Sequence, residues 1–219
     1  MASAGSRSLA QTPPPPRVGA MKPLGGDRYQ IGAVVVDKRA RRFSVPGRVN
    51  VTGKPLEYLA TAPGGMKAYE TLLEVDTTGS EFNLACILVG LERDPKLAPF
   101  ARYNAAPLAG QRVALSVAWS EGGKRHQISA AEAILNPEAG VKAEAVDWVY
   151  TAPTVSDPSA GFVPDLTGTL VGFVHDPNCI IDSAVAIGVG AYGSVRGSAL
   201  MPPVGTAVEL IVDAAAVVK

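Results

Sequence analysis

Hydrophobic and polar residues alternate over short stretches of the chain, which is the pattern of half-buried β-strands. The clearest case is 112–120, where Val113, Leu115, Val117 and Trp119 face one side. Other short apolar or β-branched stretches bounded by turn residues predict further strands. These stretches are 29–36, 41–51, 56–62, 67–75, 125–128, 146–151, 167–175 and 206–212.

Helical spacing of apolar residues is confined to two places. The stretch 82–91 predicts the main helix, with Ser80 as its N-cap. Ser129 predicts the N-cap of a short second helix that ends at Asn136. So many strands and so few helices exclude a doubly wound α/β sheet. We expect an α+β fold with a mostly antiparallel sheet that is twisted or forms an open barrel.

The chain divides into an arm and one folded domain. Residues 1–28 are expected to form a disordered, proline-rich arm, with Pro13–Pro16 as a short polyproline segment. Residues 29–219 are expected to form a single domain, because no repeat and no composition shift divides them.

Composition excludes several classes of protein. The 219 residues carry 20 Lys and Arg against 20 Asp and Glu, so the net charge is zero. Zero net charge argues against a nucleic-acid binder or a polybasic membrane-surface protein. No apolar run is long enough for a transmembrane helix. Two cysteines exclude an all-cysteine zinc site and a four-cysteine iron–sulfur cluster, and no cofactor is expected.

The N-terminal segment bears on the compartment. Ser8-Leu9-Ala10 resembles the end of a secretory signal, although the apolar stretch that would precede it is missing from this chain. We therefore expect an extracytoplasmic location, in the periplasm or cell envelope. Cys86 and Cys179 could pair in an oxidising compartment, but Cys86 also fits a small buried hydrophobe.

Two groups of polar residues are candidate sites. Lys67, Tyr69, Glu70 and Thr71 lie between a Gly-Gly turn and an apolar strand. They could line a ligand pocket at the rim of the sheet, or they could form the polar face of an edge strand.

The second group could bind a metal ion. His175, Asp176, Cys179 and Asp182 follow a predicted strand and a turn that could bring their side chains together. The alternative is an ordinary turn, because residues 176–178 read Asp-Pro-Asn.

Two catalytic motifs are not supported. Residues 188–193 spell G-x-G-x-x-G, but Pro202 leaves no room for the helix that a dinucleotide site needs, so a small-residue loop is expected. Residues 193–197 have the wrong spacing for a nucleophile elbow. The sequence therefore favours binding over catalysis.

The order of several short motifs resembles one known family. These motifs are 47–50 (GRVN), 55–59 (PLEYL), 64–73 (GGMKAYETLL), 82–91, 117–119 (VAW), 147–150 (DWVY), 164–171 (PDLTGTLV) and 201–208 (MPPVGTAV). Together they resemble the YdjY-domain family over about residues 30–213.

The resemblance implies a bacterial, commonly exported single domain with no established reaction. Some relatives carry a ferredoxin-like label, which the two cysteines of this chain do not support. Tyr69 stands where relatives often have His, so shared His-based chemistry is not implied. Glu70 and Asp165 are retained, and Asp165 is either a ligand-facing acid or a turn acid.

Two functional hypotheses follow. The first is a non-enzymatic binding protein or accessory subunit, with a protein partner in a cell-envelope complex. A low share of charged residues, 18%, fits such an interface. The second is a small-ligand or metal-binding protein, possibly an enzyme, with a polar pocket around Glu70 and Asp165.

Overall fold

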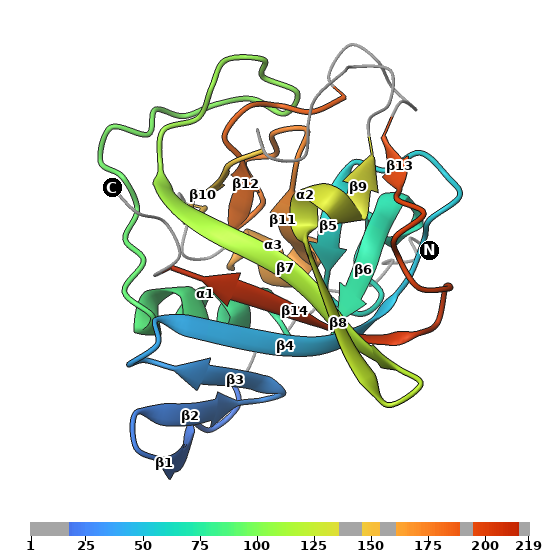
Figure 1. Cartoon of the computed structure of the whole chain (residues 1–219). Helices are drawn as coiled ribbons and strands as arrows, with labels where there is room; N and C mark the ends of the chain where they lie inside the picture. The colour runs from blue at the N-terminus through green and yellow to red at the C-terminus, as the bar shows by residue number, and fades with distance from the viewer. Residues whose placement is uncertain (1–17, 136–145, 154–160, 189–194, 215–219) are drawn as a thin grey trace, which may run out of the picture.

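Eight strands pair edge to edge into a closed barrel within the residues that the computed structural model describes, 18–135, 146–153, 161–188 and 195–214 (Figure 1). In ring order they are β4 (Arg42–Val49), β14 (Ala207–Asp213), β7 (Gln111–Glu121), β10 (Trp148–Tyr150), β12 (Ile181–Ser183), β11 (Thr169–Gly172), β5 (Tyr58–Thr61) and β6 (Thr71–Val75). The pairs are antiparallel except β11–β12 and β5–β6. The mostly antiparallel sheet is confirmed. The open barrel is wrong, because β6 pairs back onto β4.

The barrel closes where β4 changes partners. The first part of β4 pairs with β3 (Val34–Asp37), and its last three residues pair with β6, Gly47 opposite Val75. Pro46, which has no N–H to donate, lies at the change. A Cβ on Gly47 would meet the carbonyl oxygen of Glu74 and lie 2.8 Å from the Cα of Val75. Closure therefore depends on the absence of a side chain at residue 47.

Strands β4 and β7 also carry the sheet beyond the barrel. A hairpin series of β1 (Lys22–Gly25), β2 (Arg28–Ile31) and β3 extends from β4, and β8 (Lys124–Ser129) pairs with β7 (Figure 1). Residues 22–25, which the sequence assigned to the arm, thus form a strand. A separate pair joins β9 (Ile134–Leu135) to β13 (Arg196–Gly197). The predicted polyproline segment and residues 189–193 of the glycine motif lie outside the described residues.

The main helix, α1 (Gly79–Leu88), lies beside β3 and β4 (Figure 1). Its N-cap is Thr78, whose hydroxyl accepts from the Glu81 amide while Glu81 accepts from the Thr78 amide. Ser80 as N-cap is therefore wrong, because the capping box with Glu81 starts the helix two residues earlier. The buried Phe82 ring packs edge-to-face on Phe43 of β4, with centroids 5.2 Å apart.

Two further helices are short. Ser129 caps α2 (Ala130–Ala133) as predicted, but α2 ends before Asn136 because Ile134 and Leu135 join β9. The helix α3 (Val163–Thr167) was not predicted. Pro164 lies in its first turn and Gly168 ends it with a left-handed φ of 72°. A single 3₁₀ turn, η1 (Ala68–Glu70), precedes β6.

The closing glycine gives a stability prediction. Gly47→Ala should lower the free energy of unfolding by about 2–3 kcal/mol, because the added methyl overlaps the backbone of β6. Gly53→Ala is the matched control, since a Cβ there has nothing within 4 Å, and should change stability by less than about 0.5 kcal/mol. Urea unfolding followed by tryptophan fluorescence measures both. Equal stabilities of the two variants would contradict the role of Gly47 in closure.

Candidate functional site

Three acidic residues meet at one end of the barrel because of how the strands run. Glu57 precedes β5, and Glu70 precedes β6, which is parallel to β5 with Tyr58 opposite Thr71. Strand β11 runs antiparallel to β5, so the chain that leaves β11 returns to the same end and carries Asp176 there. The three residues are 5%, 5% and 3% exposed.

One arginine from a loop lies within ion-pair distance of all three acids. The Arg102 Nη2 lies 2.5 Å from Glu57 Oε2 and 3.6 Å from Glu70 Oε1, and its Nε lies 3.8 Å from Asp176 Oδ2. Arg102 belongs to the segment between α1 and β7. Its backbone neighbour Tyr103 donates an amide hydrogen bond to the carbonyl of His175, at 2.9 Å. This bond fixes the loop against the chain that follows β11.

Tyrosine hydroxyls and one lysine complete this barrel-end cluster. Tyr58 donates to Asp176 Oδ2 at 2.6 Å, and Tyr103 donates to both oxygens of Glu57 at 3.0 and 3.1 Å. Lys67 donates to Glu70 Oε1 at 2.7 Å and to the Tyr69 hydroxyl at 2.9 Å. We define the barrel-end cluster as Glu57, Tyr58, Lys67, Tyr69, Glu70, Arg102, Tyr103 and Asp176.

Burial shifts the pKa values of two groups in the barrel-end cluster. Burial, and next the negative charge of Glu70 beside it, raise the pKa of Glu57, while Tyr103 and Arg102 act in the opposite direction. Burial also raises the pKa of Tyr58, so its hydroxyl stays a hydrogen-bond donor to Asp176. The end of the barrel is thus a tightly coupled set of two cations, three carboxyl groups and three phenols.

The four predicted metal ligands lie next to this cluster, and each has a partner within the protein. Asp182 accepts from the amides of Asp176 and Ser183, and His175 Nε2 bonds to the Ser183 carbonyl. Cys179 contacts the hydroxyl of Thr169. Among the described residues, no group of three or more His, Cys, Asp and Glu side chains is arranged to hold a metal ion. Asp176 instead joins the barrel-end cluster.

The predicted ligand-binding residues are brought together only in part. Lys67, Tyr69 and Glu70 meet at the barrel end, and the Thr71 hydroxyl stabilises their turn by donating to the Lys67 carbonyl at 2.6 Å. Asp165 lies elsewhere, in α3, and accepts from the Ser80 amide at the start of α1 at 2.7 Å.

Sequence reasoning missed four members of the barrel-end cluster. Arg102 and Tyr103 lie in a proline-rich loop without periodicity, and Glu57 and Tyr58 lie at the start of a predicted strand. In both Glu57-Tyr58 and Arg102-Tyr103, a charged residue precedes a tyrosine. This pairing was the sequence feature that could have pointed to the four residues.

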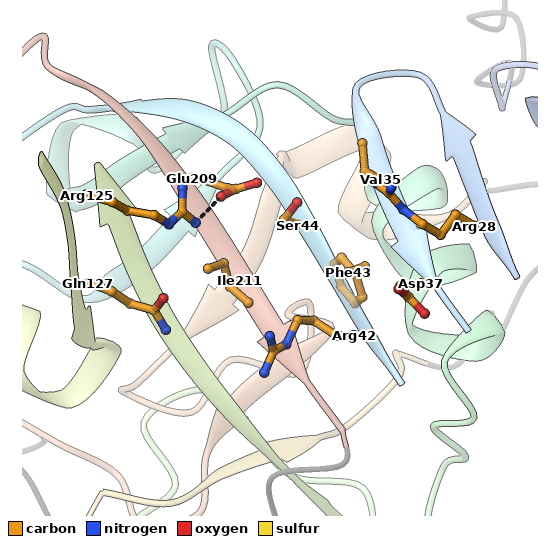
Figure 2. Close-up of a pocket in the computed structure, with 10 residues that line it drawn as sticks. All are labelled: Arg28, Val35, Asp37, Arg42, Phe43, Ser44, Arg125, Gln127, Glu209 and Ile211. Atoms are coloured by element: carbon orange, nitrogen blue, oxygen red, sulfur yellow. Dashed lines mark hydrogen bonds and ion pairs between the residues drawn. The ribbon is translucent and has the colours of Figure 1, made fainter. Parts of the chain in front are cut away.

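A second feature is a groove of about 350 Å³ on the outer face of the extended sheet (Figure 2). Its lining comes from β2, β3, β4, β8 and β14, with Ile211 and Phe43 among polar side chains. Figure 2 shows the guanidinium of Arg125 at Glu209, a contact of 2.6 Å. Arg42, also in the groove, pairs with Asp213. This outer groove is therefore polar and largely charge-balanced.

Comparison with known proteins identifies the family. The model of the YdjY domain matches residues 34–213. The chain belongs to the YdjY domain family. No curated protein and no solved structure matches it. None of the helices described in this YdjY domain is long and apolar enough to cross a membrane.

The buried Asp182 predicts how the stability of this YdjY domain depends on pH. Burial raises its pKa from 3.8 to about 8, although the amides of Asp176 and Ser183 act to lower it. The folded state therefore binds more protons than the unfolded state between these values. The contribution of Asp182 to the free energy of unfolding should therefore fall as pH rises from about 4 to about 8, by at most about 1.4 kcal/mol per pH unit.

Asp182→Asn tests this assignment by urea unfolding across that pH range. The variant should be less stable at pH 5 by about 1–3 kcal/mol, because one backbone amide loses its acceptor. It should also lose the part of the slope that Asp182 contributes. Asp27→Asn, at an exposed turn, is the control. A wild-type slope in Asp182→Asn would contradict the assignment.

Proposed function

We propose that this YdjY domain is a binding protein and that the barrel end is its site for a small polar ligand. The observation that carries the proposal is the convergence of three buried carboxyl groups, from three strand ends, on one arginine delivered by a loop. The floor of the site is fixed by the barrel. The groups that cover it, Lys67, Tyr69, Arg102 and Tyr103, are partly or largely exposed and can be reached by a ligand.

Binding is favoured over catalysis because the titratable groups of the barrel-end cluster are already paired with one another. Each carboxyl group has a cation or a phenol as partner, and His175 is buried with its Nε2 engaged by a carbonyl. Several convergent polar groups in fixed positions provide orientation and specificity for a ligand.

A panel of small polar molecules tests the proposed site. The panel holds amino acids, diamines, dicarboxylic acids and sugars, and thermal unfolding of the full chain is the readout. We expect at least one member to raise the melting temperature by roughly 5–10 °C at 100 times its Kd. Glu70→Gln should lose this protection, and Glu209→Gln in the outer groove should keep it. The proposal fails if no member protects, or if Glu70→Gln is protected as well as wild type.

A second candidate function is that of an accessory subunit in an extracytoplasmic protein assembly. The outer groove supports it, because its concave surface lies between two extensions of the sheet and presents the half-exposed Arg42 and Arg125. Arginine side chains are enriched in protein interfaces. We propose that a folded protein partner docks there.

Ser44→Trp tests this second candidate by filling the outer groove from β4. Tagged wild type and variants, expressed in the native host, are purified as complexes and analysed by size-exclusion chromatography. A defined partner should accompany wild type and Glu70→Gln but be lost from Ser44→Trp. A monodisperse monomer for wild type, or a partner retained by Ser44→Trp, would overturn the docking surface.

A further inference from the structure

The barrel-end cluster surrounds a guanidinium with the groups that recognise organic cations. The Cζ of Arg102 lies 4.6 Å from the ring centroid of Tyr103 and 5.7 Å from that of Tyr58. The carboxyl groups of Glu57, Glu70 and Asp176 lie on its edge. Aromatic faces combined with carboxylates form the usual cage for alkylguanidinium and ammonium groups.

The acidic residues and Tyr58 of the cage are positioned by the barrel, whereas the cation in the cage, Arg102, comes from a loop. Glu57, Tyr58, Glu70 and Asp176 are fixed by strand ends and by the chain after β11. Arg102 comes from the segment 92–110, which contains no helix or strand. Leu97 and Leu108 anchor this segment in a small apolar cluster on either side of Arg102. The Tyr103 amide bond to the His175 carbonyl holds the backbone of this segment, so only the Arg102 side chain, which is 30% exposed, has to move for the cage to be vacated.

Arg102 does not form hydrogen bonds with all three carboxyl groups of the cage. One of its three ion pairs is short, and the other two, at 3.6 and 3.8 Å, exceed hydrogen-bond length. Its buried Nε finds no hydrogen-bond partner among the described residues. The next residue, Tyr103, is held at a positive φ of 63°, which is unfavourable for a bulky side chain. A separate ligand is free of this backbone constraint and can bond all three carboxyl groups.

We propose that the barrel end binds an organic cation, an alkylguanidinium or primary ammonium group, which competes with Arg102 for the same cage. This inference rests on the proposed function and specifies the chemical class of its ligand. Binding moves the Arg102 guanidinium outward and replaces it between the two tyrosine rings. The affinity is then set by the difference between the ligand and Arg102, because the arginine occupies the cage in competition.

The test titrates the full chain with ethylguanidinium chloride at millimolar concentrations, by calorimetry. Wild type should bind it measurably, and Arg102→Ala should bind it at least about tenfold more tightly because the competitor is removed. Propylurea, which has a similar shape and no charge, should bind neither. Adding Glu57→Gln to Arg102→Ala should weaken binding by about tenfold, since a charge-assisted hydrogen bond is lost.

Arg93→Ala is the matched control on the same loop. The guanidinium of Arg93 bonds to the carbonyl oxygens of Ala152 and Leu97 rather than to carboxyl groups. Its removal opens no anionic cage, so this variant should bind ethylguanidinium as weakly as wild type. If Arg102→Ala does not fold, Arg102→Gln replaces it, and the same gain over wild type is expected.

Three results would overturn the proposal. The first is equal affinity in Arg102→Ala and Arg93→Ala, and the second is equal binding of propylurea. The third is binding by Arg102→Ala with none by wild type, which would make Arg102 a permanent part of the structure. If only carboxylic acids or sugars from the panel protect wild type, the ligand site is retained. The assignment of an organic cation as its ligand is then wrong.

Discussion

The pairing of β4 with β6 is the constraint on which the arrangement of this protein depends. Strand β4 leaves β3 at Pro46 and joins β6 through three residues, and Gly47 lets the two backbones approach. Without this pairing, β6 would be the edge of an open sheet. Closure removes that edge and fixes the stagger of the strands around the ring. It also holds the parallel pair β5–β6 in place, and with it the starts of both strands.

The position of the barrel-end cluster follows from this closure. Because β5 and β6 are parallel, the residues before them, Glu57 and Glu70, lie side by side. Because β11 is antiparallel to β5, Asp176 arrives at the same end. Burying three carboxyl groups together is unfavourable through desolvation and mutual repulsion, and two cations and two phenols offset this. An apolar cluster of similar volume would often be at least as stable. Stability alone therefore does not explain these residues, and this is an argument for the ligand recognition proposed above.

The sequence predicted what neighbouring residues determine. The alternation of β7 and the Ser129 cap of α2 are local patterns, and the structure contains both. Glu70 was singled out because it precedes an apolar strand. Pairing between distant segments leaves no such pattern, so Arg102, 45 residues from Glu57, was missed. A glycine within a predicted strand, Gly47, was the available signal for closure, since it often marks a close approach of two backbones.

The two candidate surfaces differ in what their charges contribute. In the outer groove, Arg42 and Arg125 are more than half exposed. Such surface ion pairs contribute little to stability, and they can exchange partners at small cost. The outer groove is therefore suited to adaptable contact with a protein surface. At the barrel end, Glu57 and Glu70 are 5% exposed, so an unpaired charge there is strongly unfavourable. A group that replaces Arg102 must bring its own positive charge and match the spacing of the carboxyl groups. This requirement makes the barrel end the more selective of the two surfaces.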